Sequence, residues 1–293
     1  MRHLAGRTAL LLLGSTLPLA ARPGAAPRPP QPPQPPQPGA PLRYDRSLPL
    51  ETTAEASANV SVGDLDGDGH LDLVLAKGRH WPLVDRVLLG DGRGRIRAAY
   101  DLGTASDRSY SSELADLDGD GDLDVVISND RRDPKLVYLN DGKARFTVGS
   151  TFGRPEWDTR NARIADVNGD GRPDIVVANR SPERSTNYVC LNRGRGRFDA
   201  DCVAFSREPA TTVTPADVDR DGRLDLVVPN RDGGQSWVYR FGADTTLAAP
   251  RRTPWGPPDA AFRVAEVADF NGDGRLDIYF SSYIGTDRMV LAR

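Results

Sequence analysis

The sequence is short of the side chains on which many catalytic centres depend. It contains three histidines, His3, His70 and His80, and two cysteines. His3 lies in a leader-like N-terminus and His70 inside an acidic loop, so no Ser-His-Asp set, Cys-His set or histidine-based zinc site can be assembled. No catalytic residues are therefore expected. Lysine is also scarce, with three residues in the whole chain, so the surface cations are mostly planar guanidinium groups.

The apolar run at the N-terminus, residues 8–20, is too short to span a bilayer comfortably. It follows Arg2 and Arg7 and precedes small residues, so residues 1–21 are expected to be a signal peptide whose cleavage point stays open. An uncleaved anchor is the alternative. The segment has no cysteine, which excludes a lipoprotein anchor. We expect a secreted or extracytoplasmic location, in the periplasm or on the cell surface.

Residues 22–41 are dominated by proline, with the sequence PRPPQPPQPPQP at their centre. Such a segment forms neither helix nor sheet and is expected to be an extended, semi-rigid linker. A stalk that holds the following domain away from a surface is favoured over a docking site for an SH3-like partner.

The most frequent motif is an acidic pattern of nine residues, D-x-[DN]-x-D-G-x-x-D, which occurs five times. Oxygen-bearing side chains stand at positions 1, 3, 5 and 9, and the glycine at position 6 permits the turn that gathers them. Calcium takes 6–8 oxygen ligands in flexible geometry, so the pattern favours calcium over zinc or copper. Up to five structural Ca²⁺ ions are expected. The predicted ligands are Asp64, Asp66, Asp68, Asp72, Asp116, Asp118, Asp120, Asp124, Asp166, Asn168, Asp170, Asp174, Asp217, Asp219, Asp221, Asp225, Asp269, Asn271, Asp273 and Asp277.

This pattern has two other interpretations. An EF-hand needs a glutamate at position 12, where this chain has Leu75, Ile127, Val177, Val228 and Phe280, and the apolar residues that follow each loop predict strands instead of helices. A metal-free Asp/Gly turn is the simpler alternative. However, the five loops carry a net charge of −15 within a chain of −3. Without cations these carboxylates would repel one another.

The loops recur every 50–52 residues, a period typical of solenoids and propellers. The sequence of each unit predicts four strands, with the acidic loop between the first two. The last unit ends after its third strand, and residues 42–50 look like a fourth strand with nothing before it. We therefore predict an all-β fold over residues 42–293, a propeller of five four-stranded blades that this N-terminal strand closes. An open array is the alternative.

Cys190 and Cys202 lie on the third and fourth predicted strands of the third unit, on either side of a hairpin. A disulfide between them is predicted for an exported chain, with their cross-strand register left open.

The repeated loop, its strand-loop-strand context and the period resemble the FG-GAP/VCBS repeat family, over residues 42–293. The resemblance implies a calcium-loop β-propeller like the integrin α-subunit head and many exported bacterial proteins. Integrin-type heads have seven blades, so five units are a departure. Arg220 replaces the usual glycine at position 4 of the fourth loop, which predicts a strained turn and weaker calcium binding there.

On a propeller the face opposite the calcium loops carries the other interstrand connections. Aromatic and arginine side chains gather in those connections, as at many recognition surfaces. The candidates are Trp81, Arg131, Trp157, Arg184 and Trp255, and the same connections also hold Arg79, His80, Tyr110, Arg132, Arg180, Arg231 and Tyr283. Packing of Trp81 or Trp255 between blades is the alternative for either ring.

We expect a monomeric, non-enzymatic binding or adhesion module for a glycan, an anionic polymer or a protein ligand, with no nucleic acid partner and no transmembrane span. A secreted polysaccharide lyase or hydrolase is the alternative. It would need an acid/base pair, which would be sought among Glu113, Glu156, Asp158, Glu183 and Glu266. An accessory domain that recruits a protein through the proline-rich stalk is a third hypothesis.

Overall fold

The computed structural model describes residues 47–181, 185–242, 246–283 and 285–292. The predicted signal peptide, the whole predicted linker, Glu183 and Arg184 lie outside the described residues. Residues 48–293 form one compact unit. Within the described ranges every regular element is a strand, and there is no helix long and apolar enough to cross a membrane.

In the described residues nineteen strands form five antiparallel sheets, one from each predicted unit. The first sheet contains β1 (Ser57–Gly63), β2 (Asp72–Lys77), β3 (Leu83–Gly90) and β4 (Ile96–Asp107). The second contains β5 (Ser109–Ala115), β6 (Asp124–Asn129), β7 (Lys135–Asn140) and β8 (Phe146–Phe152). The third contains β9 (Thr159–Ala165), β10 (Asp174–Asn179), β11 (Asn187–Cys190) and β12 (Val203–Ser206). The fourth contains β13 (Thr214–Ala216), β14 (Asp225–Val228), β15 (Ser236–Arg240) and β16 (Arg251–Trp255). The fifth contains β17 (Phe262–Ala268), β18 (Asp277–Ser282) and β19 (Arg288–Val290).

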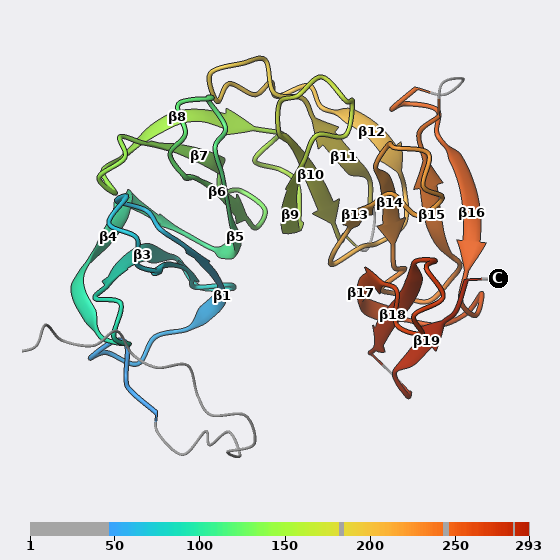
Figure 1. Cartoon of the computed structure of the whole chain (residues 1–293), viewed down its shortest axis with the longest axis horizontal. Helices are drawn as coiled ribbons and strands as arrows, with labels where there is room; N and C mark the ends of the chain where they lie inside the picture. Colours follow the sequence, from blue (N-terminus) through green and yellow to red (C-terminus); the bar gives the residue numbers. More distant parts are fainter. Residues whose placement is uncertain (1–46, 182–184, 243–245, 284, 293) are drawn as a thin grey trace, which may run out of the picture. The chain divides into compact units, whose positions relative to one another are not determined.

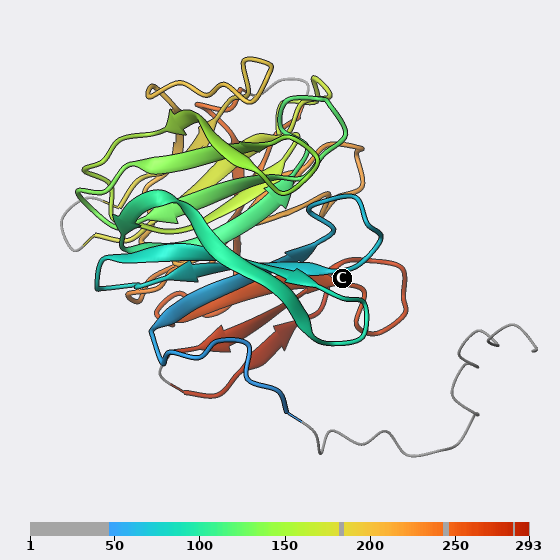
Figure 2. The same ribbon diagram turned by 90° about the vertical axis from the view of Figure 1, so that its left-hand side faces the viewer.

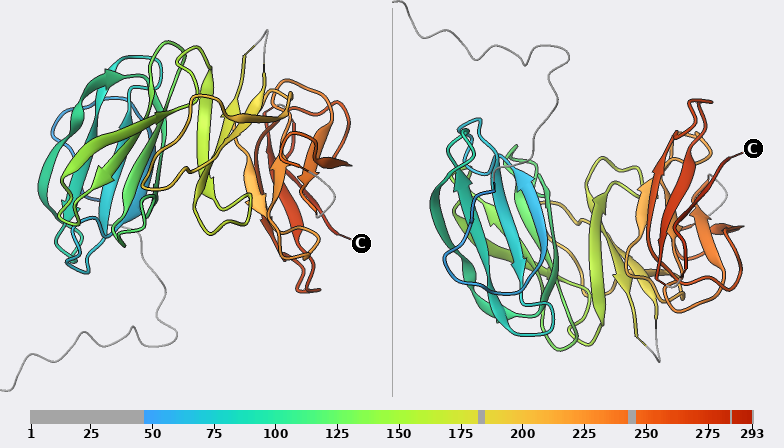
Figure 3. Two further views of the ribbon diagram at one scale, coloured as in Figure 1. Left: turned by 90° about the horizontal axis from the view of Figure 1, so that it is seen from above. Right: turned by 90° about the horizontal axis from the view of Figure 1, so that it is seen from below.

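The strands of each sheet follow one another in chain order, so each sheet is a simple meander. The first strand of each sheet contacts the first strand of the next, from β1 to β5 and onward to β17. Figure 1 shows these first strands on the inner side of the succession of sheets, with β4, β8 and β16 on the outer side. Figure 3 shows from two further directions that the sheets follow one another in chain order, and Figure 2 shows the first sheet from the side. The predicted all-β, blade-like architecture is confirmed.

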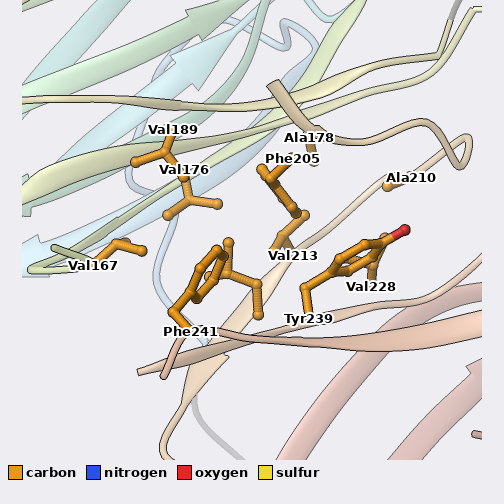
Figure 4. Close-up of a cluster of buried hydrophobic side chains, with 11 residues drawn as sticks. Val167, Val176, Ala178, Val189, Phe205, Ala210, Val213, Val228, Tyr239 and Phe241 are labelled. Atoms are coloured by element: carbon orange, nitrogen blue, oxygen red, sulfur yellow. The ribbon is translucent and has the colours of Figure 1, made fainter. Parts of the chain in front are cut away.

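The hydrophobic core is divided among four clusters, one between each pair of successive sheets. Between the third and fourth sheets, for example, Val176 and Phe205 pack against Val213, Val228 and Tyr239 (Figure 4). Second strands are covered on both faces by this arrangement, and every residue of β6 and β10 is buried. This burial explains why their central residues, 125–127 and 175–178, are all apolar without alternation.

The predicted closure by an N-terminal strand stays a prediction. Residues 42–46 lie outside the described residues. In the part of the chain that the structure describes, the fifth sheet has three strands. The described segment Leu48–Leu50 is not in a strand and lines a shallow pocket with Ile96 and Ala98 of β4, beside the first sheet. Large apolar side chains remain exposed on the first and fifth sheets, including Val62 and Met289.

The predicted disulfide between Cys190 and Cys202 is confirmed. The register that the sequence left open is now visible, because β11 and β12 pair Tyr188 with Ala204 and Val189 with Val203. The two cysteines stand next in this register, with their Cα atoms 4.3 Å apart.

A buried carboxyl group makes the stability of this fold depend on pH. Asp85 on β3 accepts hydrogen bonds from the Lys77 backbone N–H at 2.7 Å and from the Ser109 hydroxyl at 2.9 Å. Burial raises the pKa of Asp85 to about 7. The folded chain therefore holds this proton more tightly than the unfolded chain, and the stability it contributes is complete below about pH 4 and is lost as the pH rises through about 7.

We expect Asp85→Asn to flatten this dependence, so that the variant loses less of its melting temperature than the wild type between pH 5 and pH 8. Thermal melts at a series of pH values measure the difference. Asp259→Asn changes an exposed carboxylate and is the matched control, with the slope of the wild type expected. Parallel slopes for Asp85→Asn and the wild type would contradict the assignment.

Candidate functional site

Each acidic loop connects the first strand of a sheet to the second, as the sequence predicts. In the first sheet β1 ends at Gly63, the loop begins at Asp64, and Asp72 at position 9 is the first residue of β2. The apolar side chain at position 2 anchors the loop in the core between two sheets. Leu65, Leu117 and Val167 are buried in this way.

The aspartate at position 1 folds each loop around its own carboxylate. In the first loop Asp64 accepts hydrogen bonds from the backbone N–H groups of Gly67 and Gly69, each at 2.9 Å. The pair of bonds recurs in the second, third and fifth loops. Glycine is needed at position 6 because its φ is positive, for example +81° at Gly69.

The aspartate at position 9 is buried in all five loops and ties the loop to the rest of its sheet. Asp124 accepts hydrogen bonds from the backbone N–H of Leu117 inside the loop and of Asn140 at the end of β7, both at 2.9 Å. Asp72 makes the corresponding bonds to Leu65 and Gly90. Burial raises the pKa of Asp124 to about 6, and it does the same for the carboxyl groups of Asp174 and Asp225.

The carboxylates at positions 1, 3 and 9 converge in three of the loops. Their oxygens lie within 4.8 Å of one another in the sets that begin at Asp64, Asp116 and Asp217. The third and fifth loops have Asn168 and Asn271 at position 3, so fewer acids meet there. In the first loop Oδ1 of Asp66 is buried and has no hydrogen-bond partner. A set of hard oxygen donors with one unsatisfied buried oxygen fits a metal ion.

Arginines contact several of these loops, and these contacts were not predicted from the sequence. Arg97 on β4 donates to Asp66 and, at 3.0 Å, to Asp68. Arg240 at the end of β15 lies 3.2 Å from Asp219. These guanidinium groups offset part of the repulsion among the carboxylates. Their spacing from the loop differs from sheet to sheet, so no fixed motif marks them.

The fourth loop carries the strain predicted for it. Arg220 has a φ of +61°, whereas position 4 of the other loops is glycine with φ between +72° and +89°. A non-glycine residue in this left-handed region costs roughly 1–2 kcal/mol. The loop keeps the bond from Gly222 N–H to Asp217, at 3.0 Å.

On the side of the sheets away from the acidic loops, residues from all five sheets line a cavity of about 540 Å³. It brings together the predicted side chains Arg79, His80, Tyr110, Arg180 and Arg231. Two further arginines of this cavity, Arg160 and Arg263, were not among the residues predicted from the sequence. A signal for them exists, since each stands six residues before the start of its acidic loop, as Tyr110 does in the second unit.

The three tryptophans predicted for a ligand surface lie in different environments. Trp81 is 63% exposed and meets His80 edge to face at 6.1 Å. Trp157 stacks on Tyr188 at 4.0 Å, so one face of its ring is already covered. Trp255 is a core residue, 6% exposed and stacked on Phe262, and the alternative interpretation of packing between blades describes it correctly.

Arg131 and Trp157 line a second cavity of about 520 Å³ with Glu156 and Asp158. Arg131 lies 3.8 Å from Asp158. Buried Lys135 supports this wall, because its Nζ donates to the backbone carbonyls of Pro155 at 3.2 Å and Trp157 at 3.0 Å. The two predicted residues therefore lie in a cavity distinct from the one that the arginines of all five sheets line.

Solved structures share the fold at low sequence identity. An Agrocybe aegerita lectin that recognises non-reducing terminal N-acetylglucosamine is 21% identical, with a TM-score of 0.51 over 75% of this chain and 59% of the lectin. BBS1N, solved in complex with ARL6DN, is 12% identical, with a TM-score of 0.52 over 80% of this chain and 68% of that one. The Dos1 propeller is 12% identical, with a TM-score of 0.50 over 74% and 54%. These likenesses show a β-propeller fold.

No curated protein matches the chain in sequence. The model of the FG-GAP-like repeat, however, matches four overlapping segments, residues 64–127, 116–177, 166–228 and 217–280. Each match runs from the start of one acidic loop into the second strand of the following unit, and together they cover most of the chain. By these repeats the protein belongs to the FG-GAP-like repeat family.

Proposed function

We propose that this chain is an exported, calcium-stabilised β-propeller that binds a glycan or a protein ligand without chemical turnover. The observation that carries the proposal is the cavity that residues of all five sheets line away from the acidic loops. Binding sites of many proteins are concave and have a volume of about 300–1,000 Å³. Adhesion is the cellular role that such a module would serve.

Export is supported by the disulfide between Cys190 and Cys202, because such bonds persist in oxidising compartments. The leader-like residues 1–21 agree with it and lie outside the described residues. The lectin fold neighbour agrees with a glycan as ligand, although the chain spans 59% of that protein's length.

Calcium is the ion we propose for the acidic loops, held by the aspartates and asparagines at positions 1, 3, 5 and 9. The donors are all oxygens, which calcium and magnesium prefer, and the loops bend freely at glycine, which suits the larger and less demanding calcium. The role is structural, because each loop joins the two inner strands of a sheet and its buried aspartate reaches the third strand.

A second candidate function is hydrolysis or elimination on a polysaccharide. The observation in its favour is Glu113 on β5, whose pKa is raised by burial and which lies 3.1 Å from Arg163. Glu266 lies 3.8 Å from the same arginine. Polysaccharide turnover that Glu113→Gln abolishes, in a variant that still melts as the wild type does, would establish an enzyme.

Removal of calcium is expected to lower the melting temperature. An ion bound only by the folded state at 100 times its dissociation constant stabilises by about 2.7 kcal/mol per site, which corresponds to roughly 5–10 °C for a domain of this size. Melts in excess chelator, after readdition of Ca²⁺, and with Mg²⁺ alone measure the effect. An unchanged melt in chelator would contradict a structural calcium.

The fourth loop offers a direct test of loop strain. Arg220→Gly is expected to raise the calcium-loaded stability by up to about 1 kcal/mol, because glycine adopts positive φ without a steric penalty. Gly169→Ala in the third loop is the reciprocal control. A Cβ there would meet no atom within 4 Å, so its expected loss of about 1 kcal/mol is conformational. A loss of stability in Arg220→Gly would show that the arginine makes a favourable contact.

Trp81 is the tryptophan that we expect to carry ligand binding. Trp81→Ala should weaken glycan binding by about tenfold or more, since exposed aromatic anchors often contribute over 1 kcal/mol, and should leave the melting temperature nearly unchanged. A glycan array followed by calorimetry measures both. Trp255→Phe, in the core, is the control and should affect stability alone. A folded protein that binds nothing on the array would redirect the search to protein ligands.

A further inference from the structure

Arginine is concentrated in the cavity that all five sheets line, hereafter the arginine pocket. Arg79 comes from the connection after β2, Arg160 and Arg180 from the third sheet, and Arg231 and Arg263 from the fourth and fifth sheets. Five guanidinium groups from four separate sheets meet in one cavity, although they are far apart in the sequence. The pocket is therefore rich in positive charge, although the net charge of the whole chain is −3.

Few carboxylates balance this charge. Asp130 lies 3.0 Å from Arg160, and Asp232 lies 2.6 Å from Arg180 and 3.9 Å from Arg231. Within the described residues no carboxylate lies within ion-pair distance of Arg79 or Arg263. Two acids therefore face five cations. In a concave site this excess creates a field that attracts anions.

Two of the arginines are held in place before any ligand arrives. The guanidinium of Arg160 lies 4.6 Å from the centre of the Tyr110 ring, and its side chain is 17% exposed. The guanidinium of Arg231 lies 3.4 Å from the centre of the Tyr283 ring, and its side chain is 9% exposed. Stacked guanidinium planes lose little further freedom on binding, and they are suited to bidentate contacts with oxyanions.

The rim of the pocket suits the uncharged parts of a sugar. Tyr110 donates to or accepts from His80 Nδ1 at 3.0 Å, and His80 in turn contacts the exposed ring of Trp81. The hydroxyl side chains of Thr211 and Thr212 line the same pocket. An aromatic surface beside hydroxyls and cations is suited to a sugar that carries a negative group.

We infer that the arginine pocket binds the oxyanion of an acidic saccharide, a uronate carboxylate or a sulfate ester, with the adjoining sugar beside Trp81. The inference rests on the proposed binding function and narrows its ligand class. A cavity of about 540 Å³ accommodates one charged group with its sugar. It does not offer the long basic track by which proteins follow a nucleic acid backbone.

The test uses the full chain in calcium and three oligosaccharides of equal length, one neutral, one of galacturonate and one sulfated, with calorimetry as the readout. Arg79→Gln/Arg263→Gln removes the two charges that have no acidic partner, so no carboxylate is left unpaired. We expect this variant to lose at least tenfold in affinity for the acidic oligosaccharides and to keep the melting temperature of the wild type. The relative affinity for galacturonate and for the sulfated chain identifies the source of the oxyanion.

Arg93→Gln/Arg145→Gln is the matched control, because both residues are exposed in the hairpins after β3 and β7. It removes the same charge and should bind as the wild type does. Equal affinity for neutral and acidic sugars, or unchanged binding by the pocket variant, would overturn the inference while leaving the binding module intact. If a single-stranded oligonucleotide bound as tightly as the acidic oligosaccharides, the pocket would attract any polyanion, and the inference would be overturned. A folded protein that binds no saccharide would overturn the inference and the glycan part of the proposed function together.

Discussion

The hydrogen bonds of the buried aspartate at position 9 hold each unit of this protein together. Asp124 joins the backbone of its own loop at Leu117 to the end of the third strand at Asn140, and the same carboxylate occurs in every unit. Burial alone disfavours a charged carboxylate, as the raised pKa shows. The two backbone donors offset that penalty, and a cation among the neighbouring oxygens would offset it further. The acidic loop is therefore part of the folding unit and not an appendage to it.

A second hydrogen bond connects an acidic loop to the sheet that follows it. Asn140 also donates to the carbonyl of Leu65 in the preceding loop at 2.8 Å, and Asn192 does the same to Leu117. The side chains of Leu65 and Leu117 fill the core between the sheets that these bonds connect. The first and second loops are thus each fixed by their own sheet and by the following one. A structural ion in one loop would consequently stabilise two neighbouring sheets.

Most of the fold could be predicted because its determinants are local and repeated. The acidic pattern fixes the turn between two strands, and the apolar runs after it identify buried second strands, as β6 and β10 confirm. The disulfide followed from a hairpin and a spacing. The residues of the site were harder to predict, because the position of a residue in a connecting loop does not determine whether its side chain is buried. Trp255 packs on Phe262 while Trp81 projects to solvent, and nothing within either local sequence separates them. Arg160 and Arg263 were not predicted, because they lie at the starts of first strands. These starts form a shared surface only when the five sheets are assembled.

The two sides of the sheets divide the charge of the chain. The acidic loops gather eighteen predicted carboxylate ligands on one side, and the arginine pocket lies on the other. The two sides lie at opposite ends of the strands, and a six-residue strand such as β6 or β10 spans roughly 20 Å at about 3.3 Å per residue, beyond the screening distance of about 8 Å at physiological salt. Cations can then stabilise the loops without competing for the anion that the arginines attract. The repeated motif fixes the residues of the turn at one end of the first strand, so the residues at the other end of that strand are free to vary. Tyr110, Arg160 and Arg263 occupy equivalent positions there, as a tyrosine in one unit and an arginine in two others.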